Sequence, residues 1–520
     1  MRNSKIILIV SGSILLTYFI VLFLSGSVTM ADAYRGYEAM HQFNNEGAWN
    51  VLNYPSVTNP ESSSYISWWA PGQWMIPWFL KSFGIQSFQT VQFLLIGISL
   101  MISLYGYYRL FKALKFSVIV NALSILCIVT NYTFYWQTLM YHGGELFLTA
   151  LLPYFVLVLI KLASFSILKR IAVFAGIALL GLFLKNTFFI LLICAGIFIL
   201  FHQNQESLKN RLRFAWPLAL TFLLIAIPFY VFHLSVNETP SSAIDLEGYF
   251  NIPNTYLGDL VYSFSSPIGI FTRFSFLSHR INGMLSDHLR FFNVLQLLPF
   301  AFMLWFYVRS FRMRSEKYHA LLIYFCLPFF AAFTIFYLQD KAVSYEMRHF
   351  AAIGFLFFPG IIQLAKESKY SKVVGTIILL LCIMDLGIYS QQVNNINEKH
   401  VFWNNLKVPT EDGEILSEIE NWDGQHENGL ILIEDYWQLS IGQWQNDKMV
   451  VAVDDGNVRI VSGMELDHPD YLKNINVLTA DYDHILLIGR TESRVKSMLK
   501  NINWKPSIST IRFQIVSADL

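Results

Sequence analysis

Two acidic residues follow the first apolar segment of the chain, where a carboxylate could act as a base. Asp32, Arg35 and Glu38 are spaced by three residues, so a helix would place them on one face. A carboxylate beside a low-dielectric boundary can have its pKa adjusted for taking a proton from a hydroxyl group. Asp32 is therefore a candidate general base. The alternative is a helix along a membrane interface whose acidic side chains pair with Arg35.

A second group of polar residues separates later apolar segments. His142 and Glu145 are three residues apart, a spacing that in a helix could hold a divalent metal ion, although two ligands are a weak signal. The alternative is a hydrogen-bonded surface pair. Lys185 lies between runs of Leu and Phe. It either reaches the aqueous boundary along its aliphatic stem or binds an anionic lipid head group.

A third group begins a late apolar segment with the sequence Glu346-Met-Arg348-His349. An arginine at the edge of a membrane span needs a partner. Glu346 could supply it as an ion pair. A phosphate could also supply it, because a guanidinium group binds phosphate through two parallel hydrogen bonds.

Tryptophans crowd the stretch that leads into the second apolar segment. Trp68 and Trp69 precede a Pro-Gly pair, and Trp74 and Trp78 follow it. Tryptophans are common at membrane interfaces for reasons unrelated to ligands, but aromatic faces also stack on the C–H faces of sugars. Trp68 and Trp69 are thus either part of an interfacial belt or the wall of a sugar site.

The composition places most of the chain in lipid. Of its 520 residues, 54% are hydrophobic and 14% are charged, whereas a soluble domain has about 25% charged residues. The formal net charge of +1 gives no field that would steer a polyanion, which excludes a nucleic-acid-binding chain. Each of the cysteines lies within an apolar run, which argues against a disulfide framework or a zinc cluster. These residues are Cys127, Cys194, Cys326 and Cys382.

Eleven apolar segments are candidate membrane spans. They cover residues 6–24, 88–107, 118–136, 146–160, 171–184, 187–201, 214–233, 291–308, 320–338, 350–364 and 373–388. The first is longer than the apolar core of a signal peptide, which favours an uncleaved span. Lys and Arg gather in alternate connections, and the positive-inside rule then places the N-terminus in the cytoplasm.

This topology predicts two domains. Residues 1–390 form a transmembrane module with outer loops at residues 25–87 and 236–290, as expected for an integral protein of the plasma or inner membrane. Residues 391–520 form a small extracytoplasmic α/β domain, because apolar runs at residues 430–433, 449–453 and 484–488 alternate with turn signals.

Taken together, these features resemble the GT-C class of membrane glycosyltransferases. The resemblance covers the transmembrane module. It consists of Asp32 and then Glu38 after the first span, a loop with Tyr54-Pro55 and Trp69-Ala-Pro-Gly, and an Arg348-His349 pair where relatives often have Arg-Tyr. Such enzymes take a sugar from a polyprenyl-phosphate carrier and pass it to an acceptor on the outer side. The chain departs from some relatives, which have a second acid where Ala33 lies.

The resemblance implies roles for the residues described above. Asp32, with Glu38 as a second candidate, would be the catalytic acid or base of an inverting displacement, and Arg348 and Lys185 would bind the donor phosphate. The remaining candidates would contact the sugar or the acceptor: Tyr34, Arg35, Trp68, Trp69, His142, Glu145, Glu346 and His349. The implied partners are a polyprenyl-phosphate-linked sugar, a glycan, lipid or protein acceptor, and the bilayer, with no nucleic acid. A divalent metal ion stays open as a cofactor.

Two alternatives belong to other functional classes. A flippase or transporter of lipid-linked glycans would also need cations for phosphate, but it would favour charges in the middle of spans and inverted repeats. Few such charges occur, with Asp385 as an exception. The other alternative is a non-catalytic membrane protein that binds glycans through its outer domain.

Overall fold

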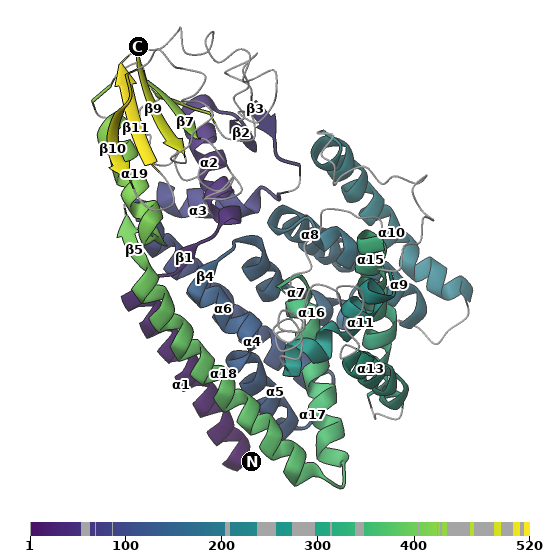
Figure 1. Cartoon of the computed structure of the whole chain (residues 1–520). Helices are drawn as coiled ribbons and strands as arrows, with labels where there is room; N and C mark the ends of the chain where they lie inside the picture. The colour runs from purple at the N-terminus through teal and green to yellow at the C-terminus, as the bar shows by residue number, and fades with distance from the viewer. Residues whose placement is uncertain are drawn as a thin grey trace. The chain divides into compact units, whose positions relative to one another are not determined.

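The computed structural model describes most of the N-terminal three quarters of the chain and parts of the remainder. The described residues are 2–53, 63–67, 69–85, 87–202, 208–236, 256–272, 297–311, 315–338, 348–403, 406–423, 425–426, 429–433, 458–461, 483–489, 503–509 and 514–519. The chain divides into two compact units (Figure 1). The first unit comprises Met1–Ser27, Ser67–Gln73 and Gln92–Asn395, and the second comprises Val28–Ile66, Trp74–Val91 and Ile396–Leu520.

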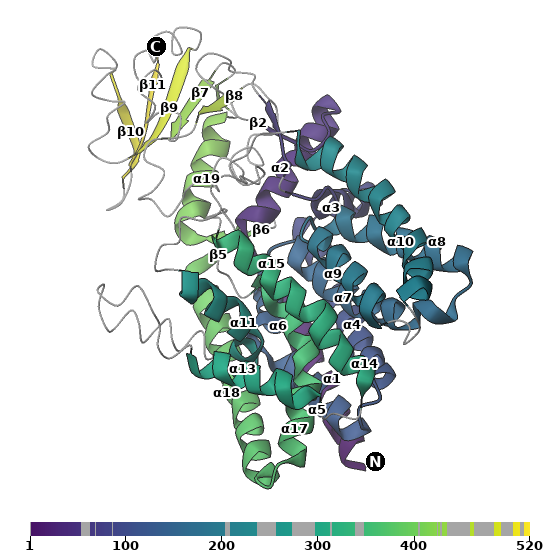
Figure 2. The same ribbon diagram turned by 90° about the vertical axis from the view of Figure 1, so that its right-hand side faces the viewer.

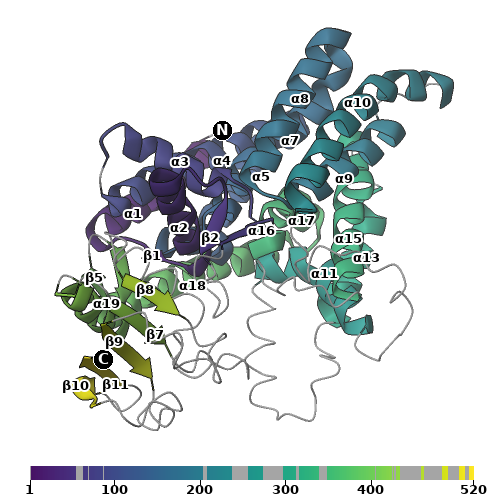
Figure 3. The ribbon, with the colours of Figure 1, turned by 90° about the horizontal axis from the view of Figure 1, so that it is seen from above.

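The first unit is helical. In chain order its helices are α1 (Arg2–Ser25), α4 (Phe88–Ala113), α5 (Val118–Thr130), α6 (Tyr132–Leu139), α7 (Gly144–Lys161), α8 (Ile167–Leu184), α9 (Phe188–His202), α10 (Leu208–Phe229), α11 (Tyr256–Thr272), α13 (Leu297–Ser310), α14 (Glu316–Leu321), α15 (Leu327–Leu338), α16 (Arg348–Gly354), α17 (Phe358–Glu367) and α18 (Ser371–Lys399). α8, α9 and α10 pack against one another (Figure 3). Large apolar side chains such as Leu24, Leu168 and Leu224 stay exposed, as expected for helices that face lipid.

The helices confirm a polytopic membrane protein but not the predicted number of spans. Within the described residues, eight helices are long and apolar enough to cross a membrane, or nine if the bent pair α5–α6 is one span. The bend of 42° falls at Asn131, whose side chain accepts a hydrogen bond from the backbone N–H of Thr133 and so caps α6. The two other predicted segments correspond to the shorter apolar helices α9 and α13.

The sequence analysis missed one packed helix. α11 lies within the predicted outer loop of residues 236–290, yet it packs on α13, α15 and α16 and buries Val261, Ile268 and Ile270. Its hydroxyl side chains hide its apolar character. Ser266 and Thr272 donate hydrogen bonds to backbone carbonyls one turn earlier in the same helix, so these polar groups are satisfied internally.

The second unit contains α2 (Ala31–Glu46), most of α3 (Gly72–Ser82), α19 (Thr410–Asp423) and short strands. β1 (Val28–Thr29) pairs in parallel with β6 (Leu406–Pro409), which pairs with β5 (His400–Trp403) in antiparallel fashion. β2 (Val51–Asn53) and β3 (Ser63–Tyr65) form a hairpin-like pair.

A five-stranded sheet ends the second unit, with the order β10-β11-β9-β7-β8 (Figure 2). Its strands are β7 (Gly429–Ile433), β8 (Val458–Val461), β9 (His484–Gly489), β10 (Lys505–Ser509) and β11 (Gln514–Asp519). β7 is parallel to β8 and β9, whereas β11 is antiparallel to β9 and β10. The predicted strands at residues 430–433 and 484–488 are confirmed, and residues 449–453 lie outside the described residues. The domain boundary at residue 390 stays a prediction.

Candidate functional site

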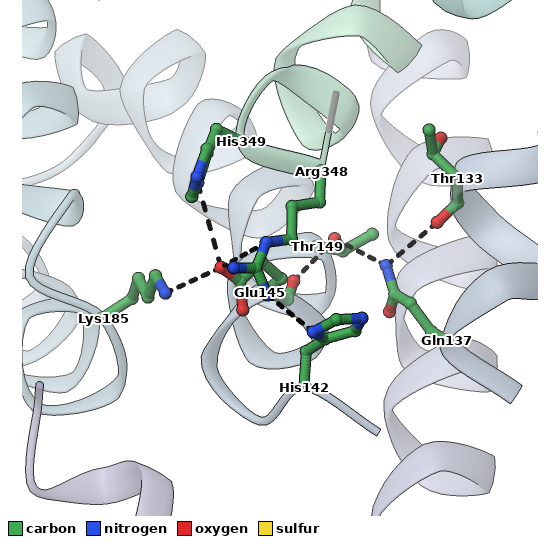
Figure 4. Close-up of polar contacts among 8 residues, drawn as sticks. All are labelled: Thr133, Gln137, His142, Glu145, Thr149, Lys185, Arg348 and His349. Carbon is green, nitrogen blue, oxygen red and sulfur yellow. Dashed lines mark hydrogen bonds and ion pairs between the residues drawn. The ribbon is translucent and has the colours of Figure 1, made fainter. Parts of the chain in front are cut away.

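Residues from distant parts of the chain meet around the carboxylate of Glu145 in the first unit (Figure 4). Lys185 Nζ lies 2.8 Å from Glu145 Oε1, and both Arg348 Nε and His349 Nδ1 lie 3.8 Å from the same oxygen. Arg348 Nη1 also lies 2.6 Å from Nδ1 of His142. We call these five residues the charged cluster. The sequence indicated each of them separately, and the structure brings them together.

The ends of helices position the charged cluster. Glu145 lies in the first turn of α7, Arg348 is the first residue of α16, and Lys185 directly follows α8, three residues before α9 begins. The first backbone N–H groups of a helix lack partners within the helix and carry partial positive charge. The beginnings of α7 and α16 therefore add to the positive potential that Lys185 and Arg348 create.

Two glycines permit the close approach of these side chains. Gly143 has a φ of +80°, which suits glycine, and it ends the short connection before α7. A Cβ atom on Gly144 would lie 2.7 Å from Lys185 Cδ and 2.8 Å from Gln73 Nε2. A larger residue at position 144 would therefore push Lys185 or Gln73 away.

Polar side chains behind Glu145 fix the start of α7. Thr149 donates a hydrogen bond of 2.8 Å to the backbone carbonyl of Glu145. Gln137 of α6 donates to the hydroxyl of Thr149, at 3.4 Å, and to the carbonyl of Thr133, at 3.3 Å. The sequence analysis missed Gln137 and Thr149. Their only signal is that they are polar residues within apolar segments.

Part of the tryptophan-rich loop belongs to the same unit. Asn186, next to Lys185, donates a hydrogen bond of 2.8 Å to the carbonyl of Ser67, and His233 Nε2 lies 3.3 Å from Asn186 Oδ1. Trp69 is buried, and so is Gln73, which lies against Gly144. Residues 67–73 therefore lie beside the charged cluster.

The charge balance of the cluster favours an anionic ligand. Its described side chains supply two permanent cations, Lys185 and Arg348, against the single carboxylate of Glu145. Glu145 is 5% and Lys185 is 9% exposed, and buried charges are costly unless they are paired. A phosphate group would compensate the excess positive charge, and Arg and Lys are the side chains that bind phosphate best.

The structure changes the local interpretation of three predicted residues. His142 precedes α7, so the predicted helical pairing with Glu145 is wrong, and Arg348 is what connects the two. Lys185 is buried and ion-paired with Glu145, and does not extend to an aqueous boundary. Arg348 contacts Glu145 and His142. Glu346 lies outside the described residues, so its ion pair with Arg348 stays a prediction.

Other candidate residues are not tested by the structure. The predicted helix after the first span is confirmed as α2. Trp68 and the side chains of the candidates on α2 lie outside the described positions, so their roles stay predictions. Those α2 residues are Asp32, Tyr34, Arg35 and Glu38.

The described residues show neither a metal site nor a disulfide. Over the described ranges, no three His, Cys, Asp or Glu side chains are grouped so that they could hold a metal ion. All four cysteines are buried free thiols.

Comparison with known proteins gave a match among solved structures only. No protein-family model and no curated protein matches the sequence. The chain is similar to the crystal structure of ArnT from Cupriavidus metallidurans bound to undecaprenyl phosphate, with 11% identity over 98% of this chain and 97% of that chain and a TM-score of 0.47. The apo structure of the same protein gives 12% identity, coverage of 99% and 98%, and a TM-score of 0.48. ArnT is a GT-C glycosyltransferase, the class that the sequence resembles. Similarity at this level establishes neither a family nor a function for this chain.

Proposed function

We propose that this chain is an integral membrane glycosyltransferase. It takes a sugar from a polyprenyl-phosphate carrier and transfers it to a glycan, lipid or protein acceptor on the extracytoplasmic face. The charged cluster carries this proposal, because it places the buried Lys185 and the half-buried Arg348 around one buried carboxylate where α7, α8 and α16 begin or end. The apolar helices supply the surroundings that a polyprenyl tail requires.

Arg348 and Lys185 are the proposed phosphate-binding residues. When the bond between the sugar and the phosphate breaks, the departing phosphate gains negative charge, and fixed cations stabilise that charge in a site with little water. Lys185 lies closer to Glu145 than Arg348 does, at 2.8 Å against 3.8 Å. Arg348 is therefore the cation less tightly held by the carboxylate, and its planar group can bind two phosphate oxygens.

Asp32 is the proposed general base, with Glu38 as the second candidate. It would remove the proton from an acceptor hydroxyl as the oxygen attacks the anomeric carbon from the side opposite the phosphate. The product would then have inverted configuration. The candidate sugar and acceptor contacts come from α2, the tryptophan-rich loop and the cluster histidines. In this proposal residues 391–520 help to select the acceptor.

Substitution of Asp32 tests the catalytic part of the proposal. Asp32→Asn should keep expression and folding but abolish transfer, because an amide of the same shape cannot accept the proton. Transfer would be measured in proteoliposomes with a panel of labelled polyprenyl-phosphate sugars. Glu46→Gln, at the other end of α2, is the matched control and should retain activity. Full activity of Asp32→Asn would remove Asp32 as the base.

Transport of a lipid-linked glycan is the second candidate, and Asp385 favours it. Asp385 is a buried carboxylate halfway along α18, where a transporter would place an ionisable group. A transporter would move labelled lipid between leaflets without an acceptor and without breaking the sugar–phosphate bond. The same proteoliposomes would reveal such movement.

A further inference from the structure

One oxygen of the Glu145 carboxylate makes all of the described close contacts with Lys185, Arg348 and His349. Lys185, Arg348 and His349 each approach Oε1, at 2.8, 3.8 and 3.8 Å. The other oxygen, Oε2, is buried and has no hydrogen-bond partner among the described residues. A buried acceptor without a donor costs free energy, so Oε2 is an acceptor that a ligand can satisfy.

A buried donor without a partner lies nearby. Gln73 is only 6% exposed, and its Nε2 atom has no acceptor within the described part of the chain. Gln73 Nε2 and the aliphatic stem of Lys185 both lie next to Gly144. A Cβ atom added to Gly144 would be within 2.8 Å of each of them. The Gln73 amide and the Lys185 side chain therefore both pack closely against Gly144, the residue that precedes Glu145.

We propose that Gln73 Nε2 and Glu145 Oε2 together bind one hydroxyl group of the sugar on the carrier, an inference that rests on the proposed function. A hydroxyl group both donates and accepts, so it satisfies the two atoms at once. A phosphate oxygen accepts only, so it cannot satisfy the acceptor Oε2. A protonated amine donates only and would leave Gln73 without an acceptor.

The chemistry of the carrier indicates which hydroxyl this is. Glu145 Oε1 is in contact with the cations proposed to hold the phosphate, and Oε2 belongs to the same carboxylate. The hydroxyl bound to Oε2 must then lie close to the phosphate. In a glycosyl phosphate the phosphate is attached to the anomeric carbon, so the nearest hydroxyl is on the adjacent carbon, C2. Gln73 and Glu145 thus select sugars that have a hydroxyl at C2.

Binding of four synthetic lipids to the purified full-length chain tests this inference. The probes are farnesyl phosphate and its glucosyl, mannosyl and 2-deoxyglucosyl esters. Wild-type chain should bind the glucosyl or mannosyl ester about tenfold more tightly than the 2-deoxy ester, the effect of one hydrogen-bonded group. Gln73→Leu should lower the affinity for the preferred ester about tenfold while changing the affinity for the 2-deoxy ester and farnesyl phosphate less than twofold.

Controls separate recognition from folding. Gln363→Leu, which changes a glutamine hydrogen-bonded to Glu367 on α17, should behave as wild type. If Gln73→Leu does not fold, Gln73→Met removes the donor with an unbranched side chain of similar length, adds no charge and should show the same selective loss.

Two outcomes would overturn the inference. One is a wild-type chain that binds the 2-deoxy ester as tightly as both parent sugars. The other is a Gln73 variant that weakens all four probes equally, which would indicate a structural role. Failure of the proposed function would give a different result. The wild-type chain would then bind no farnesyl phosphate, and Arg348→Ala would not change the affinity for any probe.

Discussion

Two buried carboxylates in the first unit have opposite surroundings. Glu145 lies at the start of α7 between the cations Lys185 and Arg348. Asp385 lies in the middle of α18. The groups near it include the phenol of Tyr18 and the thiols of Cys127 and Cys382. Both carboxylates are 5% exposed. Burial alone therefore does not distinguish a ligand site from a structural one.

The contacts around Asp385 join helices. The ring of Tyr389 on α18 lies 4.5 Å from that of Tyr18 on α1 and 5.1 Å from that of Tyr135 on α6. The contact of Tyr18 with Tyr389 thus joins α1 to α18. The thiols of Cys382 and Cys127 also lie near each other. The groups around Asp385 are neutral hydroxyls and thiols, whereas the charged cluster contains Lys185 and Arg348 and has excess positive charge. Because of this difference in charge, we propose ligand binding at the cluster and a role in helix packing for Asp385.

Loss of Arg348 should have the largest effect. Arg348→Ala is expected to lower sugar transfer about 100- to 1000-fold, the range found when one charge-stabilising donor is removed. Arg348→Lys should recover part of the activity, because it keeps the charge but not the planar pair of donors. Initial rates in proteoliposomes measure this, with Arg309→Ala on α13 as the control. An equal loss of transfer in Asp385→Asn would contradict the distinction between the two carboxylates.

Loss of Glu145 should lower stability in addition to any effect on sugar binding. Glu145→Ala leaves Lys185 buried without its carboxylate and should lower the free energy of unfolding by about 3–5 kcal/mol. The double variant Glu145→Gln with Lys185→Met removes both charges and should recover most of this loss. Thermal unfolding in detergent would show it. A double variant no more stable than Glu145→Ala would mean that the ion pair does not determine the effect.

Lys407 in the second unit is a buried lysine with a neutral partner, in contrast to Lys185, which pairs with a carboxylate. Lys407 on β6 donates a hydrogen bond of 2.6 Å to the neutral amide oxygen of Asn397, and burial lowers its pKa from 10.5 to about 8. The folded chain then loses this proton at a lower pH than the unfolded chain, so stability should rise between about pH 8 and pH 10. The expected rise in Tm is about 2–4 °C. It should be absent in Lys407→Met, and an identical pH profile in the variant would contradict the assignment.

Replacement of Asp385 should have the smallest effect. Asp385→Asn keeps the size of the side chain among neutral partners, so stability should change by about 1 kcal/mol or less and transfer by less than twofold. Transfer rates and thermal unfolding of the same preparation give both values. A loss of activity without a loss of stability would give Asp385 a functional role and favour the transport alternative.

The sequence identified the residues of the charged cluster as candidates, but it did not predict that they contact one another. Glu145, Lys185 and Arg348 stand out because charged residues are rare in this chain and flank apolar segments. Lys185 and Glu145 are 40 residues apart, and no local pattern links positions at that separation. The pairing of His142 with Glu145 in one helix was wrong because Gly143 has a positive φ and α7 begins only after it.

The fold was predictable where apolar runs are long. The predicted spans coincide with apolar helices, but α9 and α13 are short, so length cannot decide whether they cross the membrane. α11 escaped prediction because its hydroxyl groups bond within the helix. Gln73 could not be recognised, because only the packing against Gly144 shows that its amide is buried.

An experimental structure of the chain with bound polyprenyl phosphate tests the central claim most directly. The account predicts phosphate oxygens within hydrogen-bond distance of Arg348 and Lys185, with the carboxylate of Asp32 open to the same cavity. A phosphate bound elsewhere in the protein, or Asp32 on the opposite side of the membrane from Arg348, would contradict it.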